Sequence, residues 1–208
     1  MGKHVFVTVG TTKFDPMVEA IDKAAVLSSL SAKGFSSLTA QIGHGRHVPS
    51  FPVDPVCFFV SYLVYQVRFS THTYYVSPHL VCRYPYIARG KAALDCRWYR
   101  FKPTLHEDMA RADLVISHAG AGSVMEALGK PCKALVVVVN GALMDNHQEE
   151  LAEALAQRHY LRATTPEGLA DTLVGLDDSP SARTPYPPAE PEAFAAVVDE
   201  EMWAAQDR

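Results

Sequence analysis

The stretch that decides the fold runs from residue 112 to residue 128 and reads ADLVISHAGAGSVMEAL. Its first half, Asp113 to Ser117, is a short apolar run typical of a buried strand. Its second half, Gly122 to Leu128, has the composition of a helix and follows a turn of glycines and small residues. A strand, a glycine turn and a helix are the repeating unit of doubly wound sheets. We therefore predict an α/β fold with a doubly wound, Rossmann-like parallel sheet.

The same alternation continues on both sides of this stretch. Towards the N-terminus, His4–Val9 and Ser37–Ile42 are predicted strands, and Asp15–Leu30 is a predicted single helix that stops at Lys33-Gly34. Continuous apolar strands between amphipathic helices are what a parallel sheet covered on both faces requires. The remaining predicted elements are strands at 98–101, 134–139 and 159–162 and helices at 104–111, 145–157 and 166–173.

The length and composition predict one globular domain with a tail. The chain has 208 residues, of which 48% are hydrophobic and 20% charged, so it can bury a core and is neither disordered nor fibrous. We assign residues 1–176 to the α/β domain, with an atypical insert at 49–96. Residues 177–191 contain five prolines and form a predicted linker, and residues 192–208 form a predicted closing helix.

Charge and hydropathy exclude several classes of partner. With 19 Lys and Arg against 23 Asp and Glu, the net charge is −4, so no basic field attracts nucleic acid and any phosphate contact must be local. The N-terminus lacks the apolar core of a signal peptide, and the longest apolar run, Pro55–Val67, is shorter than the ~20 residues of a membrane-spanning helix. The four cysteines form no CxxC pair. We expect a cytoplasmic chain with reduced, buried cysteines and no transmembrane helix.

Two turns after predicted strands have the composition of anion sites. Gly10-Thr11-Thr12 offers a bare backbone and two hydroxyl donors, although a plain structural turn explains it equally well. In SHAGAGS at 117–123, small residues keep the start of the following helix bare, so a diphosphate could lie against its amide groups. A tight packing turn with an ordinary surface glutamate is the alternative, but the functional interpretation is favoured because five suitable residues occur together. They are His118, Gly120, Gly122, Ser123 and Glu126.

A third polar loop, NGALMDNHQ at 140–148, follows the most apolar predicted strand. The amides of Asn146 and Gln148 suit neutral sugar hydroxyls, although Asn146 could simply be part of a helix cap. The phosphate-binding GxxxxGK[ST] loop and the Gly-x-Ser-x-Gly elbow are both absent from the sequence. Kinase and serine-hydrolase functions are therefore not predicted.

Three segments carry a resemblance to a known family: VFVTVGTTKFD at 5–15, ADLVISHAGAGSVMEAL at 112–128 and NGALMDNHQEELAEAL at 140–155. Together they resemble the catalytic subunits of two-chain UDP-N-acetylglucosamine transferases of asparagine-linked glycosylation. These subunits are similar to the C-terminal, nucleotide-binding half of GT-B glycosyltransferases. The resemblance covers residues 4–48 and 97–174 and implies that residues 1–176 bind a nucleotide sugar.

The resemblance implies an inverting transfer of GlcNAc from UDP-GlcNAc to the lipid-linked acceptor GlcNAc-diphosphodolichol, the second step of lipid-linked oligosaccharide assembly. It places the chain at the cytosolic face of the endoplasmic reticulum. It also implies activity only with a membrane-anchored partner subunit that binds the acceptor, and no metal or other cofactor. Two alternatives stay open: a non-catalytic nucleotide-sugar-binding or scaffold subunit inactivated by the insert, and an enzyme that uses a different acceptor.

The resemblance also assigns roles to individual residues. Gly10, Thr11 and Thr12 would face the donor diphosphate or the interdomain cleft, and Glu126 would hold the ribose. Asn146 and Gln148 would hold the GlcNAc. A general base is needed and would come from the partner, with His118 as the candidate within this chain. The mouth for the diphosphate and sugar would consist of His118, Gly120, Gly122 and Ser123.

The sequence departs from the family pattern between Pro49 and Cys96, where it holds roughly thirty residues more than the family spacing. Ten of the twenty aromatic residues lie between Phe51 and Tyr86. The segment could be an ordinary loop, a membrane-leaning aromatic hairpin or translated non-coding sequence, and we favour the third. Uniform coverage of codons 50–96 in mature transcripts would exclude the third explanation.

Overall fold

The computed structural model of the chain describes residues 2–51, 94–130, 134–141, 147–177 and 183–188. Residues 183–188 form neither helix nor strand. The predicted closing helix, most of the predicted insert and Asn146 lie outside the described residues.

Six parallel strands form the sheet, in the order β3-β2-β1-β4-β5-β6. The order reverses between β1 and β4, and such a switch point is where doubly wound sheets bind ligands. At this point Thr8 of β1 is opposite Gln41 of β2 on one side and Ser117 of β4 on the other, so three carboxyl ends lie level. The predicted fold class is confirmed. The strands are β1 (Lys3–Thr8), β2 (Phe35–Gln41), β3 (Asp95–Tyr99), β4 (Leu114–His118), β5 (Ala134–Val138) and β6 (Arg162–Thr164).

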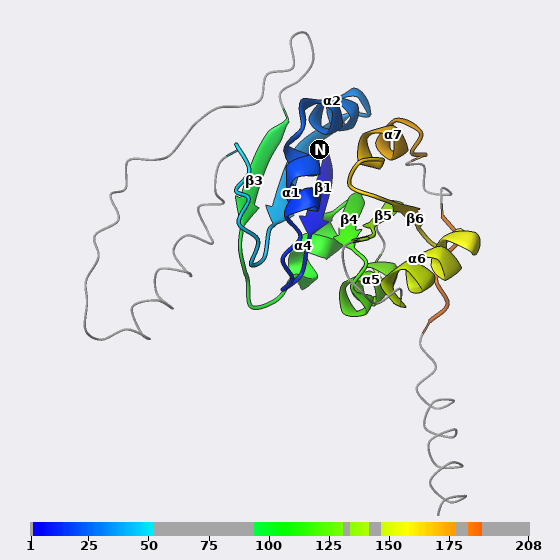
Figure 1. Cartoon of the computed structure of the whole chain (residues 1–208). Coiled ribbons are helices and arrows are strands. Elements are labelled where there is room, and N and C mark those ends of the chain that lie inside the picture. The colour runs from blue at the N-terminus through cyan, green and yellow to red at the C-terminus, as the bar shows by residue number, and fades with distance from the viewer. Residues whose placement is uncertain (1, 52–93, 131–133, 142–146, 178–182, 189–208) are drawn as a thin grey trace, which may run out of the picture.

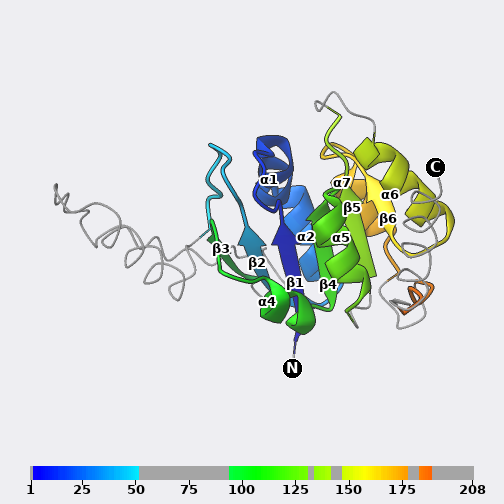
Figure 2. The same cartoon turned by 90° about the horizontal axis from the view of Figure 1, so that it is seen from below.

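Helices cover both faces of the sheet (Figure 1, Figure 2). One face packs against α1 (Asp15–Asp22), α2 (Ala24–Ala32) and α7 (Leu169–Val174). The other face packs against α4 (His106–Arg111), α5 (Ala121–Leu128) and α6 (His147–Gln157). Each face has its own hydrophobic core, which is the three-layer arrangement that the alternating sequence predicts.

Side chains alternate between these two cores along each strand. In β1, Val5 and Val7 belong to the core with α1, whereas Phe6 belongs to the core with α5. In β4, Ile116 and Val115 divide in the same way. All are at most 2% exposed, and each such side chain stabilises the fold by roughly 1.5–3 kcal/mol. Apolar residues on both sides of the strands explain why their sequences read as continuous apolar runs.

The prediction of one helix over Asp15–Leu30 is wrong, because the chain breaks at Lys23, where ψ is 137°. Neither glycine nor proline lies at the break, so packing rather than a local breaker decides it. The end of α1 is held by Ser50, whose N–H and hydroxyl both donate to the Asp22 carboxylate. Because of this break, α2 begins as a separate helix and buries Val26 and Leu30. The predicted stop at Gly34 is confirmed by its φ of +82°.

Two predicted strands are displaced along the chain. The strand expected at 159–162 begins only at Arg162, because His159 has a φ of 59° and donates its N–H to the Ala156 carbonyl in a turn that closes α6. The strand expected at 98–101 ends at Tyr99. It stops there because the chain bends at Arg100, whose guanidinium donates to two backbone carbonyls of the Gly43–Gly45 turn.

The described ranges contain no helix with the length and apolar character that crossing a membrane requires. Cys96 is buried, as predicted, and desolvation together with the negative charge of Asp95 raises the pKa of its thiol to about 12. Cys57, Cys82 and Cys132 lie outside the described residues.

Candidate functional site

Four polar side chains are buried among the described residues, and all four lie at the switch point of the sheet. Thr8 ends β1, Gln41 ends β2, and Ser117 and His118 end β4. A buried polar group costs free energy unless it is hydrogen-bonded, so such a group is retained for a structural or functional reason. The carboxyl ends of these three strands are therefore the first place to look for a site.

The His118 imidazole joins the two predicted glycine turns. It is 7% exposed and lies between Gly10 and Gly120. A Cβ atom on Gly10 would come within 2.6 Å of Cε1 of the ring, and a Cβ atom on Gly120 would overlap Nε2. Gly10 also has a φ of +62°, which side-chain-bearing residues rarely adopt. Glycine is therefore required at both positions.

Burial sets the protonation state of His118. Desolvation lowers the pKa of the imidazole below its ordinary value. A hydrogen bond with the Thr8 backbone offsets only part of this decrease in the pKa. Within the described part of the chain, Nδ1 is buried and has no hydrogen-bond partner. At neutral pH the ring is consequently neutral, so it can accept a proton at one nitrogen and donate from the other.

A cavity of about 470 Å³ opens at this point between β1, β2, β4 and the start of α5. Seven predicted site residues line it together: Gly10, Thr11, His118, Gly120, Gly122, Ser123 and Glu126. The other lining residues were not predicted as site residues: Gln41, Phe101, Lys102, Pro103, Thr104, Leu105 and Ala121.

The start of α5 forms one wall of the cavity. Gly120 is the N-cap residue, and no side chain among the described residues caps the helix. The amides of the first turn have no partner within the helix, and the helix dipole adds a partial positive charge at this end. The residues that follow are Ala121, Gly122 and Ser123, so the backbone is accessible. This wall is suited to an anion such as a diphosphate.

Of the three other predicted residues, two are described and neither lines the cavity. The Thr12 hydroxyl donates to the Val9 carbonyl at 2.8 Å, so it closes the turn and does not line the cavity. Gln148 is half-buried in the first turn of α6 and does not line the cavity either. Asn146 lies outside the described residues. The sugar-binding roles of Gln148 and Asn146 stay predictions.

Lys102 brings a positive charge to the opposite wall. Its Nζ atom lies 3.0 and 3.1 Å from the two carboxylate oxygens of Asp108 and 4.3 Å from the centroid of the Tyr99 ring. The Tyr99 hydroxyl donates to the same carboxylate at 2.6 Å. The only sequence signal for this cluster is a lysine shortly after a strand end, which by itself is common.

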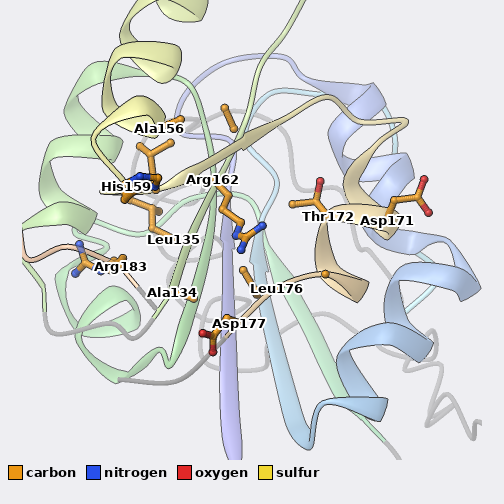
Figure 3. Close-up of a pocket in the computed structure, with 13 residues that line it drawn as sticks. Ala134, Leu135, Ala156, His159, Arg162, Asp171, Thr172, Leu176, Asp177 and Arg183 are labelled. Atoms are coloured by element: carbon orange, nitrogen blue, oxygen red, sulfur yellow. The ribbon is translucent and has the colours of Figure 1, made fainter. Parts of the chain in front are cut away.

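A second cavity, of about 510 Å³, lies between the start of β5, β6, the end of α6 and α7 (Figure 3). Ala134 and Arg162, the first residues of their strands, line it together with Asp171 and Arg183. It contains none of the predicted site residues. It also lies at the amino ends of its strands, whereas ligands of doubly wound sheets bind at the carboxyl ends. We therefore assign the site to the glycine-lined cavity.

Comparison with known proteins gives this site a context. Residues 4–201 match the glycosyltransferase family 28 C-terminal domain. The human UDP-N-acetylglucosamine transferase subunit ALG13 is 40% identical over 159 residues, which cover 76% of this chain and 11% of the human protein. The subunit of the same name from Eremothecium gossypii is 32% identical over 213 residues, which cover 95% of this chain and 92% of that protein. The chain thus spans about a tenth of the human and mouse relatives but most of the Eremothecium protein.

Solved structures agree on the fold. The NMR structure of ALG13 superposes with a TM-score of 0.53 at 24% identity, covering 94% of both chains. The crystal structure of MurG from Acinetobacter baumannii has a TM-score of 0.52 at 17% identity and covers 88% of this chain and 43% of that one. At these identities the likeness concerns the architecture of the domain.

Proposed function

Because this chain belongs to the glycosyltransferase family 28 C-terminal domains and, among them, to the ALG13 family of UDP-N-acetylglucosamine transferase subunits, we propose that it binds the donor UDP-GlcNAc for transfer of GlcNAc. The observation that carries this proposal is the cavity at the start of α5, where seven of the predicted residues meet.

The diphosphate of the donor lies against the first turn of α5 in this proposal. Gly120 and Gly122 leave the backbone amides accessible, and the Ser123 and Thr11 hydroxyls can donate further hydrogen bonds. As the bond to the sugar breaks, negative charge builds on the departing UDP, and donors already in place stabilise it without reorganisation. The same groups therefore bind the donor and assist its departure.

The ribose lies next to Glu126 in this proposal, one helical turn beyond Ser123. Glu126 lines the cavity, its side chain is 38% exposed, and one carboxylate oxygen lies 3.9 Å from Nδ1 of His106. A carboxylate can accept hydrogen bonds from both ribose hydroxyls at once. Gln148, in the first turn of α6, and Asn146 would hold the GlcNAc.

The acceptor is GlcNAc-diphosphodolichol in this proposal, and a membrane-anchored partner subunit at the cytosolic face of the endoplasmic reticulum binds it. An acceptor hydroxyl attacks the anomeric carbon, the bond from that carbon to the UDP oxygen breaks, and the configuration inverts. The hydroxyl proton must pass to a base. In this proposal the base comes from the partner subunit. Within this chain the candidate base is His118, because its neutral imidazole borders the cavity.

Thermal unfolding with and without UDP-GlcNAc tests donor binding. The wild-type chain should unfold at a higher temperature with the donor, because a ligand that binds only the folded state stabilises it. Glu126→Ala should lose this shift, whereas Glu153→Ala, an exposed glutamate of α6, should keep it. Absence of a shift in the wild-type chain would favour the non-catalytic scaffold.

The two-chain mechanism needs a separate assay. The chain should transfer GlcNAc to GlcNAc-diphosphodolichol only after co-purification with its partner, and full activity of the isolated chain would exclude a two-chain enzyme. If His118 is the base, His118→Gln should lower kcat far more than it weakens donor binding.

A further inference from the structure

Gln41 is the buried amide of the cavity wall, and no sequence pattern marks it as a site residue. It is the last residue of β2 and is 2% exposed. Its Nε2 atom donates to the Gly10 carbonyl at 2.6 Å and to the Arg100 carbonyl at 2.7 Å. Its Oε1 atom accepts a hydrogen bond from the Thr8 hydroxyl at 2.7 Å. Both N–H donors and the acceptor of the amide are thus in use.

The first of these bonds fixes the glycine turn after β1. The Gly10 carbonyl is held by Gln41, and the Gly10 N–H donates to the Thr8 hydroxyl at 3.1 Å. Both backbone groups of this positive-φ residue are therefore bound by a pair of side chains that also bind each other. The turn carries Thr11 and contacts the His118 ring, so its position decides where these groups lie in the cavity.

The second bond fixes the opposite wall. The Arg100 carbonyl is held by Gln41, and the next residues, Phe101 and Lys102, line the cavity. The Arg100 guanidinium donates to the Gly43 and Gly45 carbonyls at 3.0 and 2.9 Å, which anchors this segment to the loop after β2. Gln41 is thus the direct link between two walls that lie in different parts of the sequence.

We propose that Gln41 is a positioning residue that sets the separation of the Gly10–Thr11 turn and the Arg100–Lys102 segment for the nucleoside diphosphate of the donor. This inference rests on the proposed function of the cavity. The geometry requires two donors and one acceptor on one short planar group. Glutamate lacks the donors, methionine has no donor and only a weak acceptor, and asparagine is one methylene shorter.

UDP affinity and backbone NMR of the full chain test this role. Gln41→Met keeps the size of the side chain but leaves the half-buried Gly10 and Arg100 carbonyls without their donor. We expect the Kd for UDP to rise about tenfold or more, measured by calorimetry well below the melting temperature, and the amide resonances of Gly10 and Phe101 to shift. Gln41→Asn is the milder variant if Gln41→Met does not fold, and the same two changes are expected in it.

Ser37→Ala is the matched control, because Ser37 lies on the same strand but near its amino end. The Ser37 hydroxyl is 2.8 Å from Nδ1 of His4, so the variant also loses a hydrogen bond of β2. It should change stability and leave the Kd for UDP as in the wild-type chain. A lower melting temperature with unchanged UDP affinity in the Gln41 variants would show a merely structural role and overturn the inference.

The NMR arm separates the inference from the proposed function. If the wild-type chain does not bind UDP, the proposed function fails and the role of Gln41 towards a nucleotide fails with it. Shifts at Gly10 and Phe101 in the variants would then show only that Gln41 holds the two walls. If the wild-type chain binds UDP and the resonances of both residues stay unchanged in the variants, the inference alone is overturned.

Discussion

His118 explains why two turns that are far apart in the sequence both require glycine. The sequence predicts Gly10 and Gly120 as positions where a backbone approaches an anion. The structure adds a second reason, because the imidazole occupies the space where either Cβ atom would lie. A lone histidine in a sequence does not show which backbone it will contact, so this packing could not be predicted.

Gly120 and Gly122 should therefore respond in opposite ways to alanine. A Cβ atom on Gly120 overlaps the His118 ring, so Gly120→Ala should lower the free energy of unfolding by about 1–3 kcal/mol. A Cβ atom on Gly122 meets no described atom within 4 Å, and alanine is the better helix former, so Gly122→Ala should raise it by about 0.5–1 kcal/mol. Urea unfolding measures both changes. Gly122→Ala should nevertheless weaken UDP binding, and an unchanged affinity would contradict its place beside the diphosphate.

At the scale of elements, the sequence predicts which segments are strands and helices better than where they begin and end. The apolar runs of β1, β4 and β5 are confirmed nearly to the residue, because both of their faces are buried. The break at Lys23 could not be predicted, since it depends on how two helices pack and not on a local breaker. Gln41 and Lys102 were missed for a related reason: their partners come from other elements.

The start of α4 offers a test at this scale. Asp108 accepts hydrogen bonds from both Lys102 and Tyr99, and its side chain is 12% exposed, so it joins the end of β3 to α4. Asp108→Asn should lower the free energy of unfolding by about 2 kcal/mol, because a half-buried lysine loses its charged partner. Asp95→Asn is the control: Asp95 pairs with Arg97 on the surface, and its removal should cost at most ~0.5 kcal/mol in the same urea titration.

At the scale of the whole molecule, the two strands that precede and follow the atypical segment pair with each other in the sheet. β2 and β3 are parallel neighbours, with Leu38 opposite Cys96 and Gln41 opposite Tyr99. Phe51 and Leu94, which border residues 52–93, both belong to the core with α1 and α2. The described residues before and after this segment thus together form the hydrophobic core and the cavity.

Replacing residues 52–93 with a flexible linker should therefore leave the domain folded. A parallel pair needs a connection of about a dozen residues or more, so a linker of about ten residues added to 42–51 is long enough. The shortened chain should keep cooperative unfolding and bind UDP within about threefold of the full chain, as measured by calorimetry. A matched variant that also carries Phe51→Ala should lose stability by about 3 kcal/mol. Loss of UDP binding in the linker variant would show that the segment contributes to the site.

The contact of His118 with Gly10 and Gly120 has a consequence for protein synthesis. β1 and β4 are neighbours in the sheet, but about a hundred residues of chain are made between them. A nascent chain that has only β1, β2 and β3 outside the ribosome has one half of the glycine-lined cavity and lacks the imidazole that its first glycine turn packs against. Affinity for the nucleotide should therefore arise late and in a single step, after β4 and α5 emerge. If the cavity binds the donor as proposed, the order in which the strands leave the ribosome would keep half-made chains from binding it.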